Sequence, residues 1–159
     1  MKLIRIFTYS IIAIFLLVVV FAGSVFLNEK KFNNAISSNS LNIESASKQI
    51  LLGSSLYLKN CVSCHGNKLQ GQPKWNIEKD SAGHNYAPPL NGTGHTWHHN
   101  PEILFNIIRY GLKKMYPDYK GKMLGNDDLT DDEIWSILAY IKSTWPDSIK
   151  NEYKKMNSN

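Results

Sequence analysis

The chain has 159 residues, of which 43% are hydrophobic and 19% charged, and its formal net charge is +5 at pH 7. Basic and acidic residues are interspersed, which argues against a nucleic-acid-binding protein. Ten Gly and six Pro are too few for a fibrous or low-complexity chain, and two Cys exclude a scaffold of several disulfides. The length predicts one small domain.

The N-terminal part is strongly apolar. Residues 6–27 contain no charged side chain, and Lys2 and Arg5 precede them. A helix of this length spans roughly 33 Å, enough to cross a hydrocarbon core of about 30 Å. The leading cations favour a cytoplasmic N-terminus, so we expect residues 1–27 to form a signal anchor, with the domain exported to the other side of the membrane. The alternative is a signal peptide that is cleaved near the small residues 22–24, which leaves a soluble exported protein.

The next segment, residues 28–44, is polar, and 8 of its 17 residues are Asn or Ser. Such a composition buries little apolar area, so we expect a flexible tether between the membrane and the domain. The domain then occupies residues 45–159. This length, about 115 residues, is enough to enclose a modest hydrophobic core.

Apolar periodicity and capping residues predict three helices in the domain. The first spans residues 45–60, where small and apolar residues recur at helical spacing. The second begins after Asn100, a suitable N-cap, and ends at Gly111, a suitable C-terminal cap. The third begins after Thr130, which forms a capping-box pattern with the Glu three residues later, and Pro146 ends it. No stretch alternates as a strand does, so the predicted fold class is all-α.

Both Cys lie in one short motif, Cys61-Val62-Ser63-Cys64-His65. Two thiols three positions apart, followed directly by His, form the attachment signature of a c-type haem. On a helical turn the two sulfurs project to the same side, where they add across the two vinyl groups of one porphyrin. The His then supplies an imidazole nitrogen to the iron as the proximal ligand. We therefore predict one covalently bound haem c, with its iron, held by these three residues.

Three other uses of a Cys-x-x-Cys pair fit less well. A structural zinc site needs four ligands, commonly two such pairs, and the sequence has no second Cys pair. A dithiol redox motif belongs to a thioredoxin-like βαβ pattern, which the sequence lacks. A disulfide between Cys61 and Cys64 stays open as an alternative, but it leaves His65 unexplained.

Around this motif the sequence resembles the class I monohaem cytochromes c. The resemblance covers residues 50–146 and is carried by three segments: Gly53-x-x-Leu56-Tyr57-x-x-x-Cys61-x-x-Cys64-His65-Gly66, Leu129-Thr130-Asp131-Asp132-Glu133-Ile134-Trp135 and Ala139-Tyr140-Ile141. The middle of the chain, including Ala87-Pro88-Pro89-Leu90, resembles a bacterial subgroup of small exported or membrane-anchored members. The resemblance implies a cytochrome c-like fold in which Gly53 and Tyr57 pack against the last predicted helix near Tyr140.

The resemblance also implies a Met as second axial ligand, in the loop between the second and third predicted helices. Met115 and Met123 lie in that loop, whereas Met156 lies in a polar tail. Met123 precedes the capping box by seven residues, close to the family position, so we predict His65 and Met123 as the iron ligands. A thioether ligand raises the reduction potential relative to a second imidazole.

Other sixth ligands stay open at this point. They are Met115 and the remaining histidines: His84, His95, His98 and His99. The family usually has Pro directly after the ligand Met, whereas this chain reads Met123-Leu124-Gly125-Asn126. This departure bears on the geometry of the loop more than on the identity of the ligand.

An axial His must be held in one tautomer, usually by a hydrogen bond from its other ring nitrogen to a backbone carbonyl. The resemblance implies that this carbonyl belongs to Pro88 and that Leu90 packs on the porphyrin face. The alternative is that the Pro-Pro pair only stiffens a loop. Three aromatic residues belong either to the haem pocket or to the ordinary core: Trp97, Tyr116 and Tyr119.

These patterns predict a membrane-tethered electron carrier without catalytic residues, which passes single electrons between membrane or periplasmic redox proteins. Four Lys near Met123 form either a docking surface for an acidic redox partner or an ordinary solvated loop: Lys113, Lys114, Lys120 and Lys122. Three other functions stay open. They are a haem c subunit of a larger oxidase or dehydrogenase, a peroxidase-like enzyme or sensor with a labile sixth ligand, and a purely structural exported domain.

Overall fold

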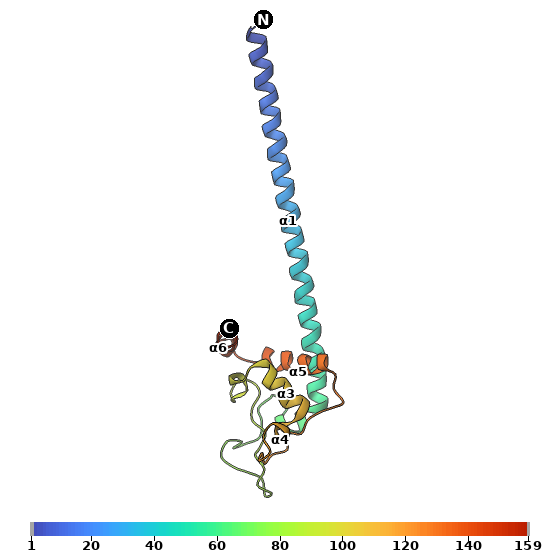
Figure 1. The fold of residues 1–159 in the computed structure, drawn as a ribbon, viewed down its shortest axis with the longest axis vertical. Coiled ribbons are helices and arrows are strands. Elements are labelled where there is room, and N and C mark those ends of the chain that lie inside the picture. Colours follow the sequence, from blue (N-terminus) through green and yellow to red (C-terminus); the bar gives the residue numbers. More distant parts are fainter. Residues whose placement is uncertain (1, 159) are drawn as a thin grey trace. The chain divides into compact units, whose positions relative to one another are not determined.

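A computed structural model describes the backbone of residues 2–158 and the side chains of residues 17 and 19–158. Its elements, shown in Figure 1, are α1 (Lys2–Asn60), α2 (Val62–His65), the 3₁₀ helix η1 (Thr96–His98), α3 (Pro101–Tyr110), α4 (Leu112–Met115), α5 (Asp131–Ser143) and α6 (Asp147–Met156). Residues 2–158 contain isolated β-bridges but no strand, so the prediction of an all-α fold is confirmed. The chain divides into two compact units, 1–45 and 46–159.

The apolar run 6–27 is helical and belongs to α1. The side chains of residues 6–16 and 18, which are 12 of the 22 residues in the apolar run, lie outside the described residues. In the part of the chain that the structure describes, no helix combines the length and the apolar character that crossing a membrane requires.

Residues 28–44 are also helical, where the sequence predicted a flexible tether. Ser38 and Ser40 donate side-chain hydrogen bonds to carbonyls three residues earlier, at 3.0 and 2.8 Å, which satisfies polar groups without interrupting the helix. Asn and Ser are only weakly unfavourable inside a helix, and this segment is continuous with helical residues on both sides. Every side chain from 28 to 44 is exposed.

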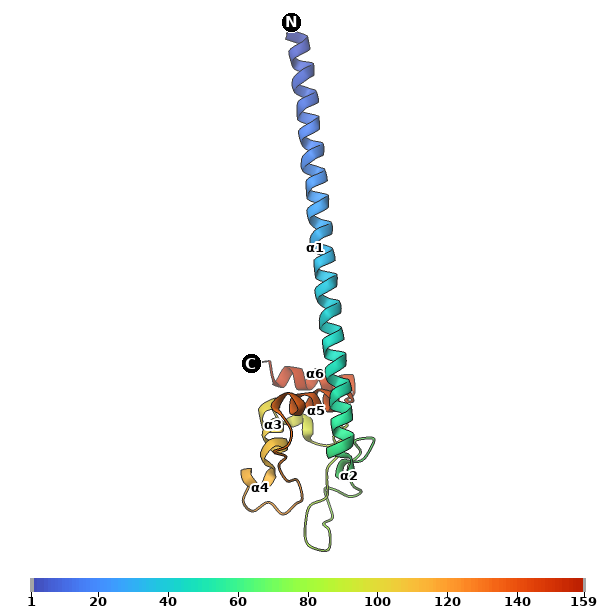
Figure 2. The ribbon, with the colours of Figure 1, turned by 90° about the vertical axis from the view of Figure 1, so that its right-hand side faces the viewer.

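The core of the 46–159 unit forms where α5 lies across the C-terminal part of α1, as Figures 1 and 2 show. A Cβ at Gly53 would come within 1.9 Å of the Ser136 carbonyl oxygen, so only Gly allows this close approach. Next to it, the Tyr57 and Tyr140 rings lie 5.5 Å apart. The packing of Gly53 and Tyr57 that the resemblance implied is therefore confirmed. Both Ile134 and Tyr57 are fully buried, and burial of each such side chain contributes about 2 kcal/mol.

The predicted caps of the second and third helices are present. The Asn100 side chain accepts a hydrogen bond from the Ile103 amide at 2.8 Å, and Gly111 ends α3 with a positive φ of 74°. Thr130 and Glu133 form the reciprocal capping box of α5. These bonds connect residues three positions apart, and this is why the sequence alone predicts them.

The C-terminal residues form α6, although the sequence predicted a polar tail that includes Met156. α5 ends at Ser143 with Thr144 as its C-cap, so it stops just before Pro146 as predicted, and Pro146 also serves as the N-cap of α6. Tyr153 is the buried residue of α6; its ring meets the Trp145 ring edge-to-face at 5.1 Å. Ile149 packs against the same core, so two side chains anchor a helix whose composition is mainly polar.

Candidate haem-binding site

The Cys61–His65 motif continues the helical backbone of α1. The Cys61 amide donates to the Tyr57 carbonyl at 2.8 Å, and the His65 amide donates to the Cys61 carbonyl at 3.0 Å. Tyr57 also donates its hydroxyl proton to the Gly66 carbonyl at 2.7 Å, which ties the end of the motif to the preceding helix. The two cysteines therefore lie within one helical turn, as the attachment motif requires.

The two thiols differ in environment. Cys61 is partly buried and Cys64 is exposed, and both are free rather than joined in a disulfide. Burial, with a smaller contribution from Cys64, raises the pKa of the Cys61 thiol to about 11. Within the described residues, no three His, Cys, Asp or Glu side chains form a group that could hold a metal ion.

His65 is only 8% exposed. Its Nδ1 lies 2.9 Å from the Pro88 carbonyl oxygen, so an imidazole protonated at Nδ1 donates this hydrogen bond and presents the Nε2 lone pair. Burial lowers the pKa of His65, and the bond to Pro88 opposes this shift. The neutral imidazole is the form that binds a metal.

The Pro88 carbonyl is itself held by the Gln72 segment. The Gln72 amide donates to the Ala87 carbonyl at 2.9 Å, and the Gln72 side-chain oxygen accepts from the Ala87 amide at 2.7 Å. Gly71 packs so closely that a Cβ there would lie 2.6 Å from the Pro88 carbonyl carbon. Sequence reasoning missed Gln72, because its partner lies fifteen residues away and no local pattern connects them.

Leu90 lies at the other end of the same segment. Its amide donates to the Leu69 carbonyl at 2.8 Å, and its carbonyl accepts the Trp145 indole proton at 2.8 Å. The Leu90 side chain is partly buried against the main core. Trp145, just before Pro146, is a second residue that sequence reasoning missed; its signal was a lone Trp after a helix.

Met123 lies in the segment between α4 and α5 and is partly buried. The Leu112 amide donates to the Met123 carbonyl at 3.1 Å, and Gly111 and Leu124 form an isolated antiparallel bridge. Burial raises the pKa of Tyr119, and a hydrogen bond with the Met123 backbone opposes this shift. Met123 therefore has a defined backbone position although Pro is absent after it.

Arg109 fixes the chain beyond Met123. Its guanidinium donates to the Asn126 carbonyl at 3.2 Å and to the Leu129 carbonyl, and it pairs with Asp131 at 2.5 Å. The Asn126 amide donates in turn to the Ile108 carbonyl at 3.0 Å. α3 is therefore connected directly to the start of α5.

Asp80 holds the chain just before Met123. Its carboxylate pairs with Lys122 at 2.8 Å and with His84 Nδ1 at 3.0 Å. The hydrogen bond from Lys122, with smaller contributions from His84, holds the pKa of Asp80 well below its usual range. The sequence Asp80-Ser-Ala-Gly-His has the pattern of a turn, but nothing in it indicates a partner 42 positions further on.

The four alternative histidines contact polar or aromatic neighbours. His84 binds Asp80, His95 stacks on Trp75 with ring centroids 5.4 Å apart, and His98 lies 3.7 Å from the Trp97 ring centroid. His99 meets His95 edge-to-face at 5.5 Å. Of the aromatic candidates, Tyr116 is 56% exposed, whereas Trp97 and Tyr119 are partly buried.

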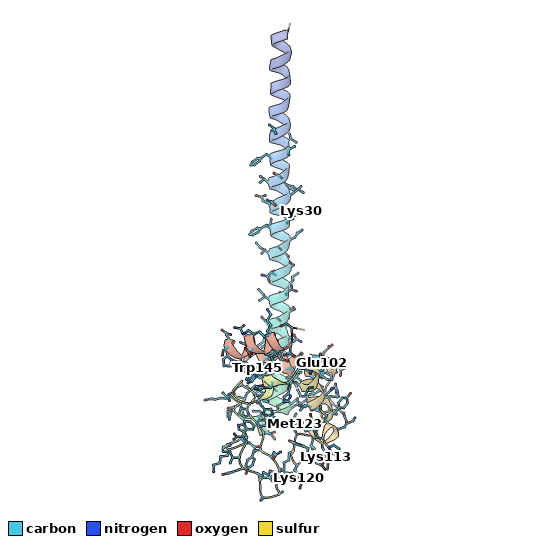
Figure 3. The ribbon with its side chains drawn as sticks, turned by 60° about the vertical axis from the view of Figure 1, so that its left-hand side comes forward. Lys30, Glu102, Lys113, Lys120, Met123 and Trp145 are labelled. Atoms are coloured by element: carbon cyan, nitrogen blue, oxygen red, sulfur yellow. The ribbon has the colours of Figure 1, made fainter. Side chains whose placement is uncertain are left out.

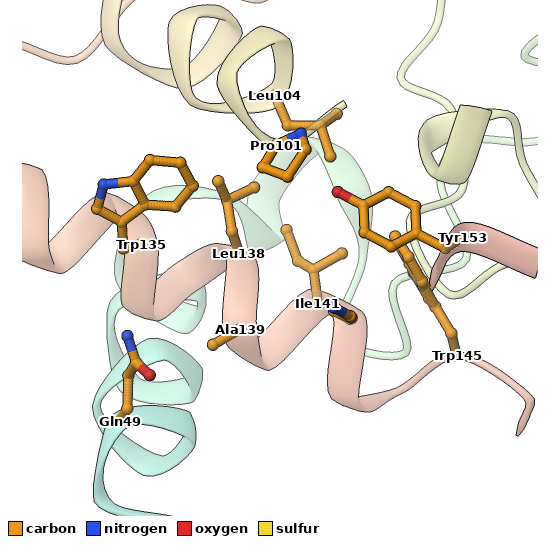
Figure 4. Close-up of a pocket in the computed structure, with 10 residues that line it drawn as sticks. Gln49, Pro101, Leu104, Trp135, Leu138, Ala139, Ile141, Trp145 and Tyr153 are labelled. Carbon is orange, nitrogen blue, oxygen red and sulfur yellow. The ribbon is translucent and has the colours of Figure 1, made fainter. Parts of the chain in front are cut away.

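An apolar pocket of about 340 Å³ lies elsewhere in the domain (Figure 4). Pro101 and Leu104 of α3 face Leu138 and Ile141 of α5 across it, and Tyr153 of α6 closes one end. None of the predicted haem ligands lines this pocket.

Comparison with known proteins identifies the family. Residues 48–141 match the family described as cytochrome C oxidase, cbb3-type, subunit III, and this match includes both the Cys61–His65 motif and Met123. The chain belongs to this family of c-type cytochromes. It is also 27% identical over 96 residues to cytochrome c-555 from Prosthecochloris aestuarii, which covers 56% of this chain and 81% of that protein. No solved structure gives a significant match.

The residues of this cytochrome fit the covalently bound haem c that the family implies. Cys61 and Cys64 supply two free thiols within one helical turn, and His65 supplies a neutral, buried imidazole whose Nδ1 is already bonded. His65 and Pro88 are in direct contact, and Leu90 and Met123 are each held by backbone hydrogen bonds. The roles of Met123, Pro88 and Leu90 toward the haem remain predictions.

Proposed function

We propose that this cytochrome is a one-electron carrier with His65 and Met123 as the axial ligands of its iron. The main support is the buried His65 imidazole, in which Pro88 engages Nδ1 while Nε2 has no hydrogen-bond partner among the described residues. Bound haem supplies a ferrous–ferric couple, and a thioether ligand favours the ferrous state. No substrate bond is made or broken, and we assign no catalytic residue.

Two observations favour Met123 over the other candidate ligands. Asp80 engages Nδ1 of His84, His95 stacks on Trp75, and the His98 ring lies tilted against the Trp97 ring. The backbone of Met123 is fixed by Leu112, and the chain on either side of it is anchored. A fixed backbone lowers the entropy cost of holding a flexible thioether side chain on a metal.

We also propose a docking surface for an acidic redox partner at Lys113 and Lys120. Both are exposed, and both lie with Met123 toward the end of the 46–159 unit away from Trp145 and Glu102 (Figure 3). The other two lysines of the predicted cluster have partners within the chain. Lys122 pairs with Asp80, and Lys114 lies over the Tyr110 ring at 4.4 Å. The docking proposal therefore rests on Lys113 and Lys120, which have no ion-pair partner among the side chains that the structure describes.

The proposed site of action is the periplasmic side of a bacterial inner membrane, where c-type cytochrome domains usually function. A membrane anchor over residues 1–27 is supported by sequence alone: 22 uncharged residues follow Lys2 and Arg5. Fractionation of cells tests this part of the proposal. Release of the haem protein by osmotic shock, without detergent, would favour the cleaved alternative.

A second candidate function is that of a haem c subunit in a larger oxidase. The description of the matching family names an oxidase subunit, and this favours the second function. Stable co-purification with further subunits after mild solubilisation would support it. Purification as a single haem chain that exchanges electrons with a soluble acidic partner would support the independent carrier.

The experiment that tests the ligation compares Met123→Ala with Met115→Ala in the haem-loaded protein. We expect Met123→Ala to abolish the long-wavelength charge-transfer band of ferric, methionine-ligated haem, to lower the midpoint potential and to allow the reduced protein to bind carbon monoxide. Met115→Ala should retain the wild-type spectrum. A wild-type protein that lacks this band or binds carbon monoxide readily would contradict the proposal and favour a peroxidase-like or sensor function.

A further inference from the structure

The loop of residues 79–85, called here the Asp80 loop, contacts the chain just before Met123. Its own turn fixes the Asp80 carboxylate, because Oδ1 accepts hydrogen bonds from the Ala82 amide at 3.0 Å and the His84 amide at 2.9 Å. The Asp80 amide donates to the His84 carbonyl at 3.0 Å. The turn itself therefore orients the carboxylate, independently of any contact with a distant residue.

From this turn, two contacts reach residues 120–122. Lys122 Nζ donates to Asp80 Oδ2 at 2.8 Å, and the Asn85 amide donates to the Lys120 carbonyl at 2.8 Å. Between them, Asn85 and Gly121 form an isolated parallel bridge. Three successive residues are thus held against the Asp80 loop, and the next residue in the chain is Met123.

We infer that Asp80 is a positioning residue for Met123: by holding Lys122, it keeps the Met123 side chain available as an axial ligand. The inference rests on the proposed ligation by His65 and Met123. Exposed ion pairs usually contribute little, because ordering two long side chains costs entropy. Here the carboxylate is only 21% exposed and is already ordered by two backbone amides, so most of that cost falls on Lys122 alone.

The test is Asp80→Asn in the haem-loaded full chain, with Asp118→Asn as the matched control. Asp118 precedes Met123 in the same segment and has no ion-pair partner among the residues that the structure describes. Both substitutions remove one negative charge. We expect Asp80→Asn to lower by roughly 5 °C the temperature at which the charge-transfer band is half lost, while Asp118→Asn leaves it unchanged. Far-ultraviolet circular dichroism should show that the helices are still folded at that temperature.

A double-mutant cycle sharpens the test. Lys122→Gln should lower the temperature as Asp80→Asn does, and the double variant should shift by less than the sum of the two, because both changes break the Asp80–Lys122 pair, while Asp80→Asn also weakens the contact with His84. Lys122→Arg, which keeps the positive charge, should lose the charge-transfer band at the same temperature as the wild type. Equal behaviour of Asp80→Asn and Asp118→Asn, additive shifts, or loss of the band only together with the helices would overturn the inference. A wild-type protein without the band would instead refute the Met123 ligation, and this inference with it.

Discussion

The His65 side of the proposed haem site is built from partly buried hydrogen bonds between side chains and the backbone, whereas the Met123 side depends largely on exposed residues. His65 is 8% exposed, and the Pro88 segment that holds it is fixed by Gln72 and Trp145. On the other side, Leu124 is 70% exposed and the Lys122 side chain 67% exposed. Hydrogen bonds between buried polar groups are costly to break, because the groups then lack partners in a medium of low dielectric constant. Segments held by exposed contacts open locally at a lower cost in free energy.

This contrast indicates which ligand can be lost. We expect His65 to remain in place in every folded state, because its removal leaves a buried carbonyl without a partner. We expect Met123 to be the ligand that local opening releases. The four predictions that follow test this asymmetry, from the largest expected effect to the smallest.

The most severe change is His65→Ala. It removes an axial ligand, opens a cavity and leaves the Pro88 carbonyl unpaired, so we expect a loss of about 3 kcal/mol in the free energy of unfolding. Met123→Ala also removes a proposed axial ligand, but its side chain is only partly buried and its loss leaves no carbonyl unpaired, so we expect a smaller cost, about 1 kcal/mol. Denaturant titration of both variants measures the difference. Equal losses would show that the two sides are equally rigid.

Two close-packed glycines allow a matched comparison of the sides. Gly71 and Gly111 both have positive φ, and a Cβ at either would come within 2.5 Å of a backbone nitrogen. Gly83 also has positive φ but has open space around its Cβ position. We expect Gly83→Ala to lower the free energy of unfolding by about 1 kcal/mol, from backbone strain alone. Gly71→Ala and Gly111→Ala should each lower it by about 2 kcal/mol more than Gly83→Ala does, because the added Cβ also clashes with the backbone.

The spectra of these variants then separate the two sides. Gly111→Ala should weaken the charge-transfer band, because a Cβ there would lie 3.0 Å from the Met123 carbonyl oxygen. Gly71→Ala should instead reduce the yield of haem-loaded protein. If Gly71→Ala weakens the band as strongly as Gly111→Ala does, the assignment of the two glycines to separate sides is wrong.

The exposed lysines of the Met123 side should affect association rather than stability. Replacing Lys113 and Lys120 with Gln should slow reduction by an acidic partner several-fold at low ionic strength and have little effect at high salt. Lys154 and Lys155 on α6 provide a control pair with the same change in charge. Stopped-flow rates that fall equally for both pairs would indicate a general effect of net charge.

The smallest expected effect concerns acid. The pKa of folded Asp80 lies below its usual value, so its contribution to stability is present above about pH 4 and is lost as the pH falls toward the folded pKa. Between pH 5 and pH 3, roughly the range where an unperturbed Asp titrates, the wild type should therefore lose more stability than Asp80→Asn. Denaturation midpoints at the two pH values measure this, and parallel losses would contradict it.

The sequence predicts this molecule best where the interactions are local. The caps at Asn100 and Thr130 and the Cys61–His65 turn depend on residues three or four positions apart, and each is present. The helical state of residues 28–44 was missed, because it depends on the flanking helix rather than on the composition of the segment. α6 was missed because only two of its residues, Ile149 and Tyr153, pack against the core, which is too few for an apolar periodicity.

The site itself is predictable in part. The Cys61–His65 motif alone predicts covalent haem attachment, and the contact of His65 with Pro88 was expected from the family resemblance. The supports of that contact were not expected, since Gln72 and Trp145 reach it across 15 and 55 positions. The pairing of Asp80 with Lys122 joins two turns, and a sequence pattern marks each turn without marking its partner.

The crossing of Gly53 and Ser136 has a consequence for the order in which the cytochrome folds. These two residues lie 83 positions apart, so closing the core requires a long loop to form. Cys61 and Val62 lie within that loop and pack against the core cluster. The start of the haem-attachment motif therefore becomes part of the packed core only once this long-range contact has formed.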